Sequence, residues 1–127
     1  VTEQFEHCWE PVSHSYLTAL RDSRETTFPD LTQEEEAQKW IRSIPKAFCN
    51  TSDKKILSQV LNNYDLETTD FYRWKVSYRQ EELAELIHRK SGIDFGQILD
   101  LVPVSRGTSG RIEMLKIIGT RRTFTIG

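Results

Sequence analysis

Hydrophobic and polar positions alternate with two different periods along the chain, and the change between them falls near residue 70. Before it, apolar residues recur at helical spacing in two short stretches. Ala37, Trp40 and Ile41 form the apolar stripe of one predicted helix. This helix begins at Asp30 or Thr32 and ends before Pro45. A second stripe predicts a helix over 52–61. Residues 1–31 show no sustained period and predict loop with short extended pieces.

The second half of the chain has the pattern of a small sheet packed on one helix. Tyr72–Tyr78 alternates as a half-buried strand does, and a helix is expected from about Gln80 to Gly92. Strands are then expected over 98–105, 111–118 and 123–126, with a hairpin connection at Gly107–Gly110 and an edge or a bulge at Pro103. The expected order is strand, helix, strand, strand, strand.

This order predicts an α+β fold with an antiparallel-rich sheet packed on helices. We divide the chain into an N-terminal segment with two short helices, 1–69, and a β-α-β-β-β module, 70–127. The chain starts with Val1 and stops inside a strand-like run, so we expect it to be a fragment of a longer protein.

Composition and charge exclude some classes of function. Apolar residues make up 37% of the 127 residues and the net charge is -2, which predicts no electrostatic attraction to nucleic acid. No apolar run approaches the roughly 20 residues of a membrane span. No Ser/His/Asp set, glycine-rich phosphate loop or paired-histidine motif is present in the sequence.

The two cysteines leave three interpretations open. Cys8 and Cys49 are separated by 41 positions and show no zinc-finger spacing. They can form a disulfide, serve as two ligands of a metal site, or be buried as small hydrophobic residues. His7 and His14 near Cys8 make the metal site conceivable, because zinc accepts imidazole and thiolate ligands together.

Several short segments form a pattern that extends over the chain. They are Val1-Thr2-Glu3 with Trp9, Tyr16–Asp22, Tyr72-Arg73-Trp74, Glu81-Glu82-Leu83, Gly92-Ile93, and Arg106–Arg111 with Leu115 and Gly119. Together these segments resemble the stage II sporulation protein D (amidase enhancer) family. They span nearly the whole chain, although 23–70 matches poorly, and the hairpin cluster around Arg106–Arg111 is the most specific.

The resemblance implies part of a secreted or envelope-facing lytic transglycosylase, whose partners are the glycan strands of peptidoglycan. In that family a glutamate acts as general acid and then base, and it lies in an N-terminal motif that this sequence lacks. We therefore expect no catalytic residue here and an inactive fragment. The family also implies zinc, for which Cys8, together with Cys49, is the matching candidate.

A second function hypothesis is a non-catalytic module that binds the cell wall or activates a wall amidase. Under either hypothesis Trp9, Tyr16 and Tyr72 are candidates for facing sugar, although core packing is the more common role of such residues. Glu3, Glu6 and Glu10 lie near aromatic residues, but carboxylates beside aromatics are ordinary on protein surfaces.

Overall fold

The computed structural model describes the chain except residues 1, 22, 25–26, 46, 48–49 and 61–71. Its α+β class is the one expected from the sequence. The elements, in chain order, are η1 (Phe5–His7), α1 (Glu34–Arg42), α2 (Lys54–Val60), α3 (Gln80–Ser91), β1 (Ile98–Arg106), β2 (Ile112–Gly119) and β3 (Thr123–Ile126).

The sheet is antiparallel throughout, with strand order β1-β2-β3. Pro103 lies in β1, an edge strand, and the register shifts immediately after it, as expected for a residue without a backbone N–H. The connection between β1 and β2 is closed by the Gly107 N–H, which donates to the Arg111 carbonyl at 2.9 Å. The predicted hairpin is therefore confirmed.

The main core lies between α3 and the sheet. Phe95, Ile98 and Ile117 are buried there, and Leu83 and Ile87 of α3 pack against them. Gly119 of β2 allows the Phe95 backbone to lie directly against the strand, because a Cβ at residue 119 would lie 2.2 Å from the Phe95 carbonyl oxygen. Gly92 ends α3 with φ of 71°, the left-handed conformation expected there.

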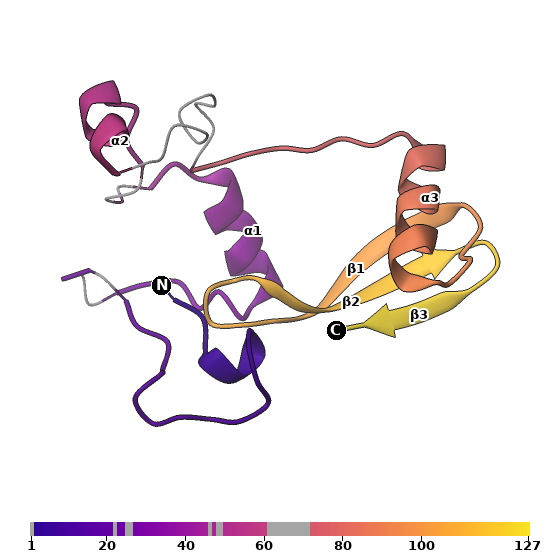
Figure 1. The fold of residues 1–127 in the computed structure, drawn as a ribbon, viewed down its shortest axis with the longest axis horizontal. Helices are drawn as coiled ribbons and strands as arrows, with labels where there is room; N and C mark the ends of the chain where they lie inside the picture. Colours follow the sequence, from indigo (N-terminus) through magenta and orange to yellow (C-terminus); the bar gives the residue numbers. More distant parts are fainter. Residues whose placement is uncertain (1, 22, 25–26, 46, 48–49, 61–71) are drawn as a thin grey trace.

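A second contact holds α1 near the tip of the β1–β2 hairpin. Leu31 and Ala37 are buried at this end, and the buried Arg106 guanidinium pairs with both carboxylate oxygens of Glu34. Arg106 also donates to the Gly110 carbonyl at 2.6 Å. Figure 1 shows α1 and α3 at opposite ends of the hairpin, with an extended segment running between them.

The strand predicted over Tyr72–Tyr78 is wrong. Tyr72 and Arg73 lie in a bend, and Trp74–Tyr78 form an extended segment (Figure 1) that pairs with no strand among the described residues, so the observed C-terminal order is helix, strand, strand, strand. The alternating pattern is typical of a half-buried strand, but Trp74–Tyr78 are all exposed. A strand also needs a partner, and the local pattern does not supply one.

Candidate functional site

The N-terminal segment is fastened to the β1–β2 hairpin by one carboxylate. The backbone N–H groups of Gln4, Thr108 and Ser109 donate to Glu3, as do the hydroxyls of Thr108 and Ser109, at 2.6–3.0 Å. Gly107 leaves room for the carboxylate, since a Cβ there would lie 2.2 Å from Glu3 Oε2. We call this arrangement the Glu3 clasp.

The clasp fixes the charge state of Glu3. Burial, which leaves 6% of the side chain exposed, would raise the pKa of the carboxyl. The hydrogen bonds from Ser109, Gln4 and Thr108 favour the ionised form more strongly and lower the pKa from 4.5 to about 2. A general acid needs a pKa near the working pH, so Glu3 is unsuited to that role.

Glu3, His7 and Glu113 form the one group of three metal-ligating side chains found among the described residues. Nδ1 of His7 contacts Oε1 of Glu113 and lies 3.6 Å from Oε1 of Glu3. A carboxylate offers about four lone-pair positions, and Glu3 already accepts five hydrogen bonds. A metal ion would have to displace these donors, so the group is better suited to joining η1 to β2.

The structure describes one of the two predicted zinc residues, Cys8. Cys8 is exposed and free, and it belongs to no group of three metal-ligating side chains in the described part of the chain. Cys49 lies outside the described residues. Because Cys8 is exposed, its interpretation as a buried small hydrophobic residue is wrong; the disulfide and the metal site, which both need Cys49, stay predictions.

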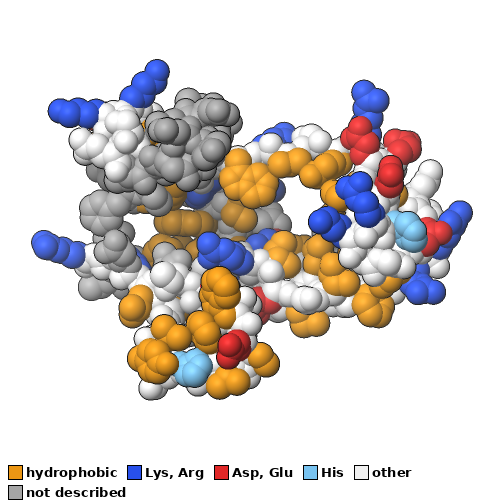
Figure 2. Space-filling view, in the orientation of Figure 1, with side chains coloured by type: hydrophobic (Ala, Val, Ile, Leu, Met, Phe, Trp, Pro, Cys, Tyr) orange, Lys and Arg blue, Asp and Glu red, His pale blue; other side chains and the backbone are white. Residues whose placement is uncertain are grey.

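The N-terminal segment carries two exposed aromatic rings, Trp9 and Tyr16, and two partly buried rings, Phe5 and His14. Trp9 is 80% exposed and Tyr16 is 76% exposed, so core packing is the wrong role for both. The His14 ring lies 5.5 Å from the Tyr16 ring and 5.3 Å from that of Phe5. We call the three neighbouring rings of Phe5, His14 and Tyr16, together with the exposed Trp9 of the same segment, the aromatic surface. Figure 2 shows hydrophobic side chains gathered beside a histidine over this part of the molecule.

The segment that carries the aromatic surface is held at both ends. The Thr2 N–H donates to the Leu20 carbonyl at 2.8 Å, and the Leu20 N–H donates to the Thr2 hydroxyl at 2.7 Å. The Ala19 N–H donates to the Gln4 side chain at 3.0 Å. Because Thr2 and Gln4 flank Glu3, the clasp also positions these anchors. Tyr72, the third candidate for facing sugar, is half-buried and lies under the Arg73 guanidinium.

Sequence reasoning missed the residues that build the clasp. The sequence predicts Thr108 and Ser109 as a hairpin connection and, through the family resemblance, as part of a matching segment; it gives no signal for Glu113. Hydroxyls and free N–H groups in a tight turn are ready donors to an anion, but the sequence does not reveal which of its 19 acidic residues reaches them.

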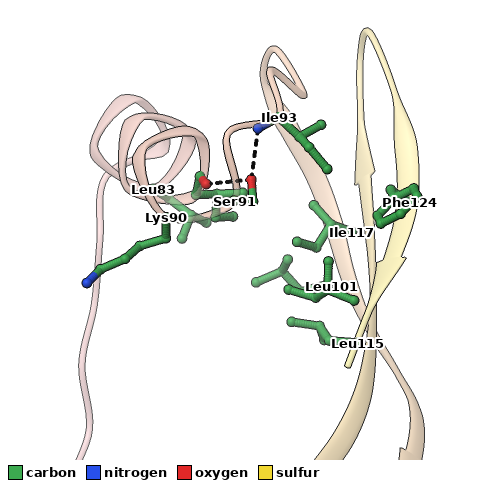
Figure 3. Close-up of a pocket in the computed structure, with 10 residues that line it drawn as sticks. Leu83, Lys90, Ser91, Ile93, Leu101, Leu115, Ile117 and Phe124 are labelled. Carbon is green, nitrogen blue, oxygen red and sulfur yellow. Dashed lines mark hydrogen bonds between the residues drawn. The ribbon is translucent and has the colours of Figure 1, made fainter.

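A hollow with a volume of about 480 Å³ lies between α3 and the sheet. Its lining is mostly apolar and includes Leu101, Leu115 and Phe124. Figure 3 shows Leu101, Leu115 and Ile117 projecting from the sheet toward α3. We call this hollow the α3 cleft.

Within the described residues no helix has the length and apolar character needed to cross a bilayer.

A family model described as Domain of unknown function (DUF8618) matches residues 3–127. No curated protein and no solved structure matches the chain.

Proposed function

The chain belongs to the family described as Domain of unknown function (DUF8618), and from its own residues we propose that it is part of a peptidoglycan lytic transglycosylase of the stage II sporulation protein D type. In this proposal the region binds glycan strands outside the cytoplasm and contributes no catalytic acid of its own.

The observation that carries the proposal is the aromatic surface. Trp9 and Tyr16 are large rings left in solvent, on a segment held in place at both ends. Exposed apolar patches of this kind mark binding sites. Aromatic rings offer a flat apolar face, and Tyr and Trp add a polar group at the edge. The C–H faces of sugar rings and their hydroxyls match these two features.

The Glu3 clasp gives the proposal further support. Thr2-Glu3 and Arg106–Arg111 are two of the segments that carry the family resemblance, and more than 100 positions separate Glu3 from Ser109. The clasp joins them directly. Two segments that contact each other in one folded unit are expected to occur together in the same chain. The contact therefore accounts for the presence of both segments here.

The clasp also explains why we propose binding without cleavage. The Glu3 side chain is 6% exposed, and its pKa of about 2 keeps the carboxyl ionised at neutral pH. It cannot deliver a proton to a glycosidic oxygen at that pH.

Sedimentation with purified insoluble peptidoglycan tests the proposal. We expect the chain to pellet with the glycan, and the double variant Trp9→Ser, Tyr16→Ser to bind about tenfold more weakly, since each lost ring removes a large apolar contact. Trp74→Ser is the matched control, because Trp74 is 77% exposed but lies outside the aromatic surface. Release of sugar fragments is not expected from any of them.

A wild-type chain that stays in the supernatant would refute the proposal. Equal loss of binding in Trp74→Ser would refute the assignment to the aromatic surface. Zinc at Cys8 is a separate prediction: metal and thiol analysis of wild type and Cys8→Ser tests it, and metal-free protein with two reactive thiols would contradict it.

A further inference from the structure

The extended segment Trp74–Tyr78 has the properties of a strand without a partner. Trp74, Val76 and Tyr78 alternate with Lys75 and Ser77, which is the period of a strand with one apolar face. All five residues are exposed, and the described part of the chain gives their backbone no hydrogen-bond partner. Exposed apolar side chains and unpaired N–H groups together favour pairing with a sheet edge.

The sheet of the same chain has two free edges among the described residues, and they differ in how well they accept a strand. β1 contains Pro103 and three register shifts, features that obstruct pairing. β3 pairs with β2 over Thr123–Ile126 without a shift, so its outer edge is regular. Its four residues are close in length to Trp74–Tyr78.

The α3 cleft lies beside β3 and is open at Phe124, which is half exposed. The Ser91 hydroxyl, which also lines it, is already used: it donates to the Ile87 carbonyl and accepts from the Ile93 N–H. The Lys90 ammonium points away from the strands in Figure 3. The cleft therefore suits apolar side chains better than a hydrophilic ligand.

We propose that Trp74–Tyr78 of one copy adds to the outer edge of β3 in a second copy, as a fourth strand. Trp74, Val76 and Tyr78 then cover the α3 cleft beside Phe124. A chain cannot make this contact with its own β3. The segment comes from the side of α1 and joins the start of α3 at the end away from β3 (Figure 1). A reciprocal exchange closes a twofold dimer.

Analytical ultracentrifugation over a range of protein concentrations tests the proposal. We expect a reversible dimer in wild type and a dissociation constant at least about tenfold higher in Val76→Lys, since burial of the valine is lost and a charge faces the cleft. Val12→Lys is the matched control: Val12 is 52% exposed and Val76 is 54% exposed, so neither substitution disturbs the core. It should dimerise like wild type.

Hydrogen exchange provides a second readout at the residues themselves. The amides of 74–78 should gain protection as wild type and Val12→Lys are concentrated, and not in Val76→Lys. A chain that remains monomeric at millimolar concentration overturns the proposal. So does a dimer that Val76→Lys leaves intact, or one that forms with no protection of 74–78. Binding to peptidoglycan is measured separately at dilute protein, so its failure and the failure of dimerisation are distinguishable.

Discussion

Replacing Glu3 with glutamine tests whether one ionised carboxylate holds the N-terminal segment to the hairpin. Glutamine keeps the size of the side chain but removes the charge, and its amide nitrogen cannot accept the hydrogen bonds from Ser109. The clasp donors that lose their acceptor are part-buried, so the loss is larger than that of a surface contact.

The pKa of Glu3 sets the size of the effect. A lowering from 4.5 to about 2 corresponds to about 3 kcal/mol of stabilisation. Because the folded-state pKa lies below the unfolded one, this contribution is fully present above about pH 4.5 and is lost as the pH falls toward 2. About 2 kcal/mol of it should disappear between pH 7 and pH 3.

Urea unfolding at pH 7 and pH 3 measures both quantities. Wild type should lose more stability between these two pH values than Glu3→Gln, by about 2 kcal/mol. At pH 7 the variant should unfold at lower urea. Glu10→Gln is the control, since its side chain is exposed and outside the clasp. If Glu3→Gln and wild type lose the same stability on acidification, the reasoning about the clasp is wrong.

Four further variants probe the fold and the metal question. Arg106→Lys should lower the free energy of unfolding by about 1–2 kcal/mol, because lysine cannot pair with both oxygens of Glu34; an unchanged urea midpoint would contradict this. Gly119→Ala should cost at least about 2 kcal/mol through the clash with Phe95, and Gly92→Ala, which meets nothing within 4 Å, only about 1 kcal/mol through its positive φ; thermal unfolding should rank them so. Glu113→Gln should leave the effect of added zinc on the melting temperature unchanged, because the clasp donors already occupy Glu3; a zinc-induced rise that Glu113→Gln abolishes would show that a metal displaces these donors.

The sequence by itself determined the elements whose signals are local. The stripe of Ala37, Trp40 and Ile41 gave α1, and Pro45 placed its end within a few residues. Gly92 and Gly110 marked turns at which the backbone takes a positive φ, a conformation that glycine adopts without strain. Pro103 marked an edge strand and a register shift for the same kind of reason, since it lacks a backbone N–H.

The tertiary structure alone decided which distant groups meet. The pairing of Glu3 with Thr108 and Ser109, and of Arg106 with Glu34, depends on how the hairpin folds back over the N-terminal half. Local periodicity carries no information about such contacts. The same limit explains why the sequence did not predict the exposure of Trp9 and Tyr16 or the absence of a strand at Tyr72–Tyr78. The sequence shows that a residue is apolar or has a strand-like pattern, but burial and pairing depend on what lies opposite it in space.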